Sequence, residues 1–160
     1  MFQGQLLAIA ICAESKLPMQ AVDAIEARAG QGLVGDRYLL GKGVSQKEPA
    51  KPEQEVTLIE LEAIEAAAHD YSLPVAHLET RRNLLTQGVP LNHLVGREFT
   101  VGSTVLRGLE LCEPCGHLER LTRAGMKKAL NHRGGLRAQI VQGGELRVGD
   151  VIRPVSSSDM

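Results

Sequence analysis

The stretch LRAQIVQGGELRVGDVIRPV, residues 136–155, has the clearest structural pattern in the chain. Apolar residues alternate with polar ones on both sides of a double glycine, as in strands with one buried face. The apolar positions are Leu136, Ala138, Ile140, Leu146 and Val148. Because Gly143-Gly144 favours a tight turn, this pattern predicts a hairpin followed by a final strand over residues 151–155.

Shorter segments of the same kind precede this stretch. Apolar or alternating runs predict strands over residues 6–12, 56–59, 82–86, 98–101 and 104–111. The last two are separated by Gly102-Ser103, which favours a second hairpin. Strands are therefore expected along most of the chain.

Helical patterns are confined to a few segments. Residues 60–69 form the clearest predicted helix, and residues 117–130 are broadly helical with an interruption at Gly125. Propensity also favours a helix over residues 19–28. The glycines and prolines between residues 35 and 52 predict a long loop.

Predicted strands outnumber predicted helices, and no regular strand-helix-strand period is visible. This favours a mainly β domain, a closed or partly closed β-barrel with a few covering α-helices. The length of 160 residues is typical of one domain. We expect a single domain over residues 1–155 and a frayed, serine-rich tail over residues 156–160.

Composition restricts the classes of function. Apolar residues make up 43% of the chain and charged residues 23%, which is typical of a soluble globular protein. A formal charge of −1, with two Phe, two Tyr and no Trp, argues against nucleic-acid and membrane binding. The N-terminus has no basic secretory segment, and the apolar run at residues 6–12 is too short to span a bilayer, so we expect a cytoplasmic protein. There the three cysteines would be reduced thiols.

The sharpest local motif is CEPCGH, residues 112–117. A zinc site would have to recruit His117 and another histidine, haem attachment needs His directly after the second cysteine, and a thioredoxin-type pair lacks its usual strand-helix-strand surroundings. Two interpretations remain open: one nucleophilic or metal-ligating thiolate supported by the other cysteine, or two buried structural cysteines. We expect Cys115, at the strand end, to be the more reactive thiol and Cys112 to point elsewhere.

Two polar clusters suit an oxyanion such as phosphate. Arg81-Arg82-Asn83 places guanidinium donors beside a carboxamide, and in a strand Arg82 would face away from the other two. His132-Arg133 brings a third basic group before the closing hairpin. A solvated strand start and a polar turn are the ordinary alternatives for these clusters.

Five motifs, in this order, resemble the MOSC domain family, whose domain lies at the C-terminus of molybdenum cofactor sulfurases: GLVGDRY (32–38), RRNL (81–84), LCEPC (111–115), HRGGLRA (132–138) and GGELRVGDVI (143–152). The resemblance covers about residues 5–154 and is to a small stand-alone protein of bacterial type. It implies a mainly β, barrel-like fold and changes the expectation for residues 19–28 from helix to strand. The pyridoxal phosphate domain of the sulfurases is missing, so no pyridoxal phosphate is implied.

The resemblance also implies a site. A cysteine that matches Cys115 carries sulfur or coordinates molybdenum, with Arg81, Asn83 and Arg133 near the bound molybdenum cofactor (molybdopterin) or another anion. His132 belongs to the same basic motif. We expect Arg81, Asn83 and Arg133 to converge near the Cys115 sulfur, because a thiolate that holds sulfur or a metal needs cationic or hydrogen-bonding neighbours.

We therefore predict a sulfur carrier or a molybdenum-cofactor-associated protein. Cys115 would accept a persulfide sulfur or a metal, and Cys112 would be a supporting or resolving thiol. The partner would be a sulfur donor or a molybdenum-cofactor protein. Two alternatives stay open: a non-enzymatic anion- or metal-binding module using Cys112, Cys115 and His117, and a thiol-disulfide oxidoreductase in which both motif cysteines matter equally.

Overall fold

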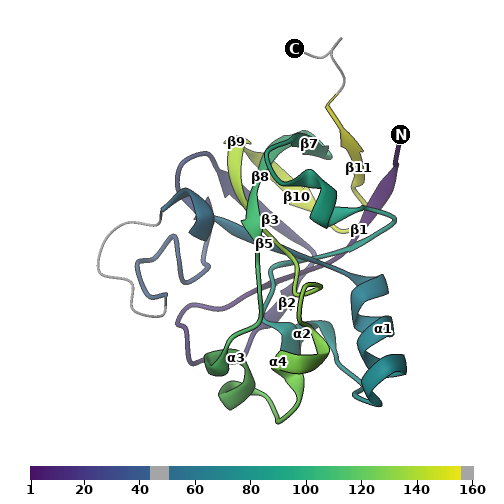
Figure 1. The fold of residues 1–160 in the computed structure, drawn as a ribbon. Helices are drawn as coiled ribbons and strands as arrows, with labels where there is room; N and C mark the ends of the chain where they lie inside the picture. Colours follow the sequence, from purple (N-terminus) through teal and green to yellow (C-terminus); the bar gives the residue numbers. More distant parts are fainter. Residues whose placement is uncertain (44–50, 156–160) are drawn as a thin grey trace.

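The computed structural model describes residues 1–43 and 51–155 (Figure 1). The predicted tail, residues 156–160, and the middle of the predicted long loop, residues 44–50, lie outside the described residues. Within the described ranges, no helix has both the length and the apolar character needed to cross a membrane.

In the described residues, seven strands close into a barrel. Their order around the barrel is β11-β7-β8-β9-β5-β6-β1, and β1 pairs again with β11 to complete the ring. The strands are β1 (Gly4–Ile11), β5 (Val56–Glu60), β6 (Leu84–Gln87), β7 (Glu98–Val101), β8 (Thr104–Leu111), β9 (Leu136–Gln142) and β11 (Val151–Pro154). The predicted mainly β barrel is confirmed, as is the antiparallel hairpin of β7 and β8.

Residues 20–28 form strands, as the family resemblance implies, and not the helix that propensity favours. β2 (Gln20–Val22) pairs with β1, and β3 (Ala24–Arg28) lies between β10 (Gly144–Arg147) and β4 (Gly32–Leu33) in a separate small sheet. Strand pairing thus overrides local propensity in this segment.

The predicted hairpin through Gly143-Gly144 is wrong. β10 pairs with β3 instead of folding back on β9. A Cβ on Gly143 would lie 2.5 Å from the carbonyl oxygen of Ala27, so the glycine lets the chain turn tightly against β3 and leave the barrel.

The helices are α1 (Leu61–Tyr71), α2 (His77–Thr80), α3 (Gly116–Leu121) and α4 (Met126–Ala129), with 3₁₀ turns η1 (Pro52–Gln54) and η2 (Leu91–Leu94). α1 to α4 gather at one end of the barrel (Figure 1). β5 and β6 are parallel neighbours joined through α1 and α2, a strand-helix-strand crossover that the sequence pattern does not reveal because it occurs once. The predicted interruption at Gly125 separates α3 from α4.

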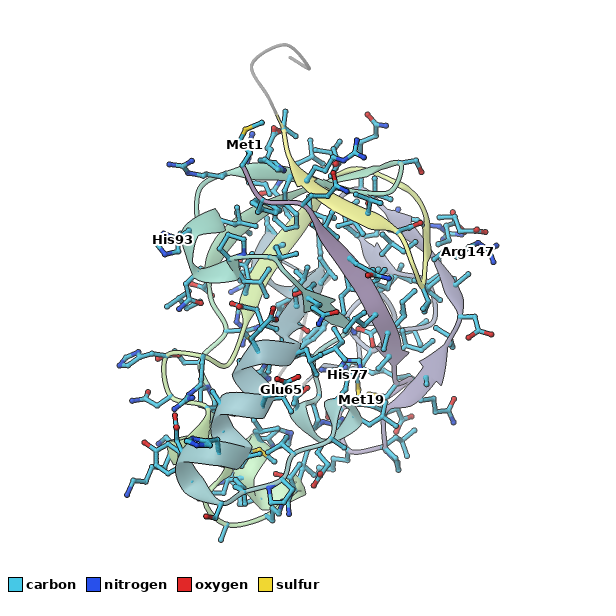
Figure 2. All side chains as sticks on the ribbon, turned by 90° about the vertical axis from the view of Figure 1, so that its right-hand side faces the viewer. Met1, Met19, Glu65, His77, His93 and Arg147 are labelled. Atoms are coloured by element: carbon cyan, nitrogen blue, oxygen red, sulfur yellow. The ribbon has the colours of Figure 1, made fainter. Side chains whose placement is uncertain are left out.

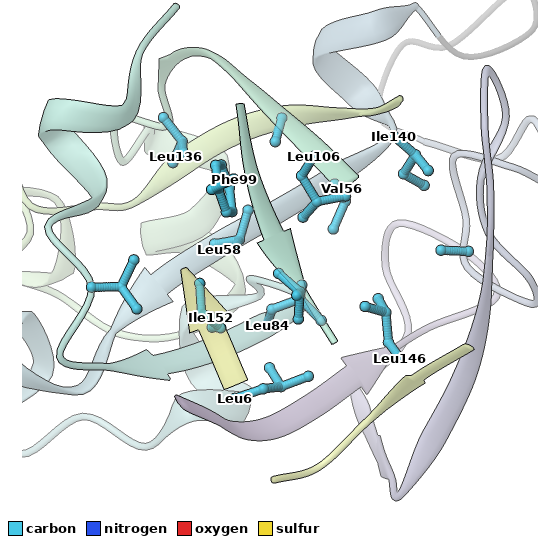
Figure 3. Close-up of a cluster of buried hydrophobic side chains, with 14 of the residues drawn as sticks. Leu6, Val56, Leu58, Leu84, Phe99, Leu106, Leu136, Ile140, Leu146 and Ile152 are labelled. Atoms are coloured by element: carbon cyan, nitrogen blue, oxygen red, sulfur yellow. The ribbon is translucent and has the colours of Figure 1, made fainter. Parts of the chain in front are cut away.

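Two large apolar cores result from this arrangement, beside a small buried cluster of Ala10, Cys12 and Met19. The barrel interior is filled by side chains that include Leu6, Leu58, Leu84, Phe99, Leu106 and Leu136 (Figure 3). The second core lies between the barrel and the helices and includes Ile59, Ile64, Leu118, Met126 and Leu130. Successive residues of β5 therefore contribute to different cores: Leu58 points into the barrel, and Ile59 points out of it toward the helices. Charged side chains such as Glu65 on α1 and Arg147 on β10 point outward (Figure 2).

A buried carboxamide joins three strands of the barrel. Asn83 is fully buried just before β6, and its Oδ1 accepts hydrogen bonds from the backbone N–H and the hydroxyl of Thr57 at 3.0 and 3.1 Å. Its Nδ2 donates to the carbonyl of Ala10 at 3.0 Å. Asn83 thus connects β5, β1 and the start of β6 inside the protein.

Replacing this carboxamide should destabilise the barrel. Asn83→Ala leaves the buried N–H of Thr57 and the carbonyl of Ala10 without their partner, so we expect the free energy of unfolding to fall by about 2–3 kcal/mol. Chemical denaturation measures this loss. The control is Asn92→Ala, at an exposed residue that makes one hydrogen bond to the carbonyl of His132, with an expected loss below about 1 kcal/mol. Equal losses in both variants would contradict the structural role of Asn83.

Candidate functional site

The exposed thiol of Cys115 lies in a cavity of about 340 Å³, called here the Cys115 pocket. Its lining includes several cationic side chains, a histidine and a phenol: Arg37, Arg81, Arg137, His117 and Tyr38. A larger and more open cleft, of about 880 Å³, is lined by Phe2, Pro90 and Arg97 among others, with no cysteine among its described residues. The smaller cavity is therefore the candidate site, since it holds the nucleophile.

The three cysteines differ sharply in exposure, and all are free thiols. Cys12 and Cys112 are buried, with 3% and 1% of their surfaces exposed, whereas Cys115 is exposed. Cys115 has an extended backbone directly before α3 (φ −127°, ψ 172°), while Cys112 follows β8 inside the fold. The structure therefore places Cys115 at the surface and Cys112 inside the fold, as predicted.

The buried side chain of Arg82 holds the backbone of the CEPCGH motif in place by hydrogen bonds. Its Nε donates to the carbonyl of Gly134 at 2.7 Å, its Nη2 to the carbonyl of Cys112 at 2.9 Å and its Nη1 to the carbonyl of Thr80 at 3.3 Å. The prediction that Arg82 faces away is wrong, because this buried guanidinium lies at the pocket and fastens three backbone segments together. Gly134 permits the close approach, since a Cβ there would lie 2.5 Å from the Cys112 carbonyl oxygen.

Arg81 turns toward the pocket from a left-handed backbone (φ 58°) at the end of α2. Its Nη1 donates to the carbonyl of Leu17 at 2.8 Å and its Nη2 to that of Ser15 at 2.7 Å. Nη2 also lies 3.4 Å from the Sγ of Cys12. Burial lowers the pKa of Arg81, and Cys12 opposes this shift, yet a guanidinium stays charged at any physiological pH.

The buried ion pair of Arg37 with Asp36 lies next to Arg81. Arg37 Nη1 lies 3.3 Å from Asp36 Oδ1 and 3.5 Å from Cys12 Sγ, and Arg37 Nη2 donates to the carbonyl of Arg81 at 3.3 Å. Asp36 is fully buried, and its Oδ1 also accepts from the backbone N–H of Cys12 at 3.1 Å. Burial raises the pKa of Asp36, an effect that Arg37 and backbone donors oppose. Asp36 and Cys12 thus hold the guanidinium of Arg37 at the pocket, and Cys12 also contacts that of Arg81.

Arg137 and Tyr38 also line the Cys115 pocket. Arg137, on β9, lies 3.6 Å from Glu110 through its Nε and interacts with the side chain of Tyr38. Burial lowers the pKa of Arg137, but Cys112, Tyr38 and Glu110 together outweigh it and raise that pKa. The guanidinium of Arg37 stacks on the Tyr38 ring, 4.8 Å from its centre.

His117 is the second residue of α3 and lines the pocket with Cys115. Its Nε2 is buried and has no hydrogen-bond partner among residues 1–43 and 51–155. Burial lowers the pKa of His117, and the nearby cations Arg81, Arg120, Lys16 and Arg37 lower it further. Both effects favour the uncharged form of the imidazole.

Several residues predicted for the site lie elsewhere. Arg133 pairs with Asp70 Oδ2 at 3.1 Å and lies over the Tyr71 ring, at the end of α1. The side-chain amide of Asn83 is hydrogen-bonded to Thr57 and Ala10 inside the barrel. Of the three residues predicted to converge at Cys115, Arg81 lines the same cavity, whereas Asn83 and Arg133 do not. For Asn83 the reason is the left-handed backbone at Arg81, which breaks the strand alternation on which the prediction depends. For Arg133 the reason is its ion pair with Asp70.

His132 contacts the rim of the pocket indirectly. Its Nδ1 lies 2.9 Å from Glu113 Oε2, and its backbone N–H donates to Glu113 Oε1 at 2.9 Å. Glu113 lines the pocket, so this pair joins the loop before β9 to the cysteine motif. The imidazole itself is largely exposed to solvent.

Sequence reasoning missed Arg37, Tyr38, Cys12 and Arg137 as site residues. Arg37 and Tyr38 end the GLVGDRY motif, and Arg137 belongs to HRGGLRA. These two motifs, already used for the family resemblance, could therefore have pointed to these three residues. Across the described ranges, no three His, Cys, Asp or Glu side chains are placed to hold a metal ion. Cys112, Cys115 and His117 therefore do not form the metal-binding set of the alternative hypothesis.

The fold and the site define a β-barrel protein with an accessible thiol in a cationic pocket. The chain belongs to the MOSC domain family, whose sequence profile matches residues 45–153. Comparison with curated protein sequences gives no match.

Solved structures of low sequence identity have the same fold. The YuaD protein from Bacillus subtilis gives a TM-score of 0.76 at 15% identity, over 95% of this chain and 97% of that chain. YiiM from Geobacillus stearothermophilus gives 0.72 at 12% identity, over 96% of this chain and 75% of that chain. YiiM from Escherichia coli gives 0.67 at 17% identity, over 95% and 70%. At these identities the likeness establishes the fold alone.

Alkylation should separate the three thiols. Under limiting iodoacetamide in native buffer, we expect Cys115 to react at least about tenfold faster than Cys112 or Cys12, because thiol reactivity requires access to the reagent. Peptide mass mapping over time gives the three rates, and labelling after denaturation gives the control in which exposure is equal. Faster native labelling of Cys112 would contradict this assignment.

Proposed function

We propose that this MOSC protein is a sulfur carrier or a molybdenum-cofactor-associated protein, in which Cys115 is the acceptor thiolate. The observation that supports this proposal best is the exposed Cys115 thiol in one cavity with Arg37, Arg81 and Arg137. Guanidiniums stabilise a thiolate and attract anionic ligands to it. The partner would be a sulfur donor or a molybdenum-cofactor protein of the cytoplasm.

The sulfur-transfer step needs a single nucleophile. The Cys115 thiolate attacks the outer sulfur of a donor persulfide, R–S–SH, and forms a new S–S bond. The S–S bond of the donor breaks, and the donor leaves as the thiolate R–S⁻. The product is Cys115 persulfide, so sulfur moves between two thiols without any external oxidant or reductant.

The same residues fit the molybdenum cofactor. A cysteine thiolate is a soft ligand suited to a metal with sulfur ligands, and the arginines suit a phosphate-bearing, anionic group. Cys115 would be the metal-side ligand, and Arg81 and Arg137 would hold the anionic part. When bound, this cofactor supplies a redox-active molybdenum centre.

Cys112 has a different environment from Cys115, which bears on the thiol-disulfide alternative. Its side chain is buried, and its carbonyl is held by Arg82 at 2.9 Å. A thioredoxin-like cycle requires both cysteines to exchange disulfides with a partner, whereas a carrier requires one accessible thiol. The difference in exposure therefore favours the carrier.

Cysteine variants should separate these functions. After incubation with glutathione persulfide, we expect Cys115→Ser to lose the +S mass shift entirely and Cys112→Ser to keep it, because the acceptor is one nucleophile. Intact mass and molybdenum content are measured on the same preparations, with melting temperature as the folding control. Equal loss of loading in both variants would contradict the single-acceptor proposal and support disulfide exchange.

The pocket arginines should matter for loading, and Arg133 should not. We expect Arg81→Gln to lower the second-order rate of loading by about 3–10-fold, because it removes one cation that attracts the anionic donor and stabilises the thiolate. Arg133→Gln is the matched control, since that guanidinium pairs with Asp70 instead. Rates are compared at low and high salt, where the difference should shrink. A larger loss in Arg133→Gln would contradict the assigned pocket.

A further inference from the structure

We propose that the sulfur donor of the Cys115 pocket is a small zwitterionic amino-acid persulfide, with its carboxylate held by Arg81 and its ammonium group held by Glu53. This inference rests on the proposed sulfur-carrier function and names the class of donor for the same site. It follows from two accessible side chains of opposite charge that line the pocket and that form no ion pair within the described structure.

The pocket is lined by charges of both signs. The cations are Arg37, Arg81, Arg82 and Arg137. The carboxylates are Glu53, Glu110 and Glu113. A simple anion is repelled by carboxylates and a simple cation by guanidiniums, so such a lining favours a ligand that carries both charges. The volume of about 340 Å³ lies at the lower end of the range for small-molecule sites, about 300–1,000 Å³, which suits a small donor.

Most of these charges already interact with the protein itself. Three ion pairs include pocket residues: Arg37 with Asp36 at 3.3 Å, Arg137 with Glu110 at 3.6 Å, and Glu113 with His132 at 2.9 Å. Arg82 is buried, and its guanidinium donates hydrogen bonds to three backbone carbonyls. The charges that remain for a ligand are therefore those of Arg81 and Glu53.

The positive charge of Arg81 is not compensated by a carboxylate. The half-buried guanidinium contacts the carbonyls of Leu17 and Ser15 and the sulfur of Cys12, and it joins no ion pair within residues 1–43 and 51–155. Its Nε makes no hydrogen bond to a described residue, so N–H donors remain for a ligand. Neutral carbonyls orient a guanidinium without cancelling its charge, so an entering carboxylate meets a positioned cation.

The negative charge of Glu53 is uncompensated in the same way. Glu53 is half-buried on η1, and its carboxylate has neither a hydrogen bond nor an ion pair to any residue that the structure describes. Glu53 and Arg81 line one cavity but do not pair with each other. A ligand that carries an anionic and a cationic group neutralises both side chains at once, which neither a simple anion nor a simple cation can do.

An amino-acid persulfide such as cysteine persulfide carries a carboxylate, an ammonium group and a hydropersulfide in one small molecule. Arg81 and Glu53 bind the two charged groups, which leaves the hydropersulfide for Cys115. The Cys115 thiolate forms a bond to the outer sulfur, and the S–S bond of the donor breaks with its electron pair on the departing thiolate. The outer sulfur keeps its proton, so the step yields Cys115 persulfide and cysteine thiolate without an external oxidant or reductant.

The experiment measures the second-order rate of Cys115 loading, by intact mass, with three donors. Cysteine persulfide has both charged groups, cysteamine persulfide lacks the carboxylate, and 3-mercaptopropionate persulfide lacks the ammonium group. Each variant is compared with the wild type on the same donor, because this ratio removes the intrinsic reactivity of the donor.

The Glu53 variants should act only through the ammonium group. We expect Glu53→Gln to slow loading by the two donors with an ammonium group about 5–10-fold and loading by 3-mercaptopropionate persulfide less than about twofold. Glu53→Lys should slow the first two further and speed loading by 3-mercaptopropionate persulfide, whereas a merely structural role would slow all three alike. Arg81→Gln should slow the two donors with a carboxylate about threefold more than cysteamine persulfide.

The matched control is Glu65→Gln, because Glu65 is an exposed carboxylate on α1 outside the Cys115 pocket (Figure 2) and should leave all three rates unchanged. Melting temperatures test the folding of each variant. Equal effects of both Glu53 variants on the three donors would overturn the donor class and leave the proposed function standing, as would loading by glutathione persulfide alone. A wild-type protein that no persulfide loads would overturn both proposals.

Discussion

The cysteine motif depends on one guanidinium. Arg82 donates to the carbonyls of Cys112, Gly134 and Thr80 and so joins the end of β8, the loop before β9 and the end of α2. Hydrogen bonds from a charged donor to three carbonyls are strong where water is excluded. Because the neighbouring Arg81 and Asn83 project from the same short segment, this clamp also determines where the pocket cation and the barrel amide lie.

The pocket concentrates positive charge in a chain whose overall charge is close to zero. Arg37, Arg81 and Arg137 approach one cavity from three segments distant in sequence, and Asp36 and Cys12 hold two of them from behind. Because removing one partner of a buried ion pair leaves an uncompensated charge, Asp36 and Arg37 are held together in the folded state. The local field at Cys115 therefore arises from folding and is invisible in the formal charge of −1.

The cysteines divide into distinct roles by burial alone. Cys12 receives two guanidinium contacts at 3.4 and 3.5 Å and donates to the carbonyl of Glu14 at 3.1 Å, which makes it part of the framework under the pocket. Cys112 is enclosed at the end of β8, and Cys115 meets solvent. A single accessible thiol in one cavity with Arg37, Arg81 and Arg137 is the arrangement from which the proposed function follows.

Much of this protein was determined by its sequence alone. Alternating apolar residues specified most of the strands of the barrel, because a one-residue shift would expose every core side chain, and the CEPCGH motif located the cysteine that the fold leaves accessible. The tertiary structure decided the rest. It turned Arg82 and Asn83 inward, directed Arg133 to Asp70 and brought Arg37 and Cys12 beneath Arg81. These outcomes depend on a left-handed backbone at Arg81 and on contacts between residues distant in the chain, neither of which a local pattern of residue types encodes.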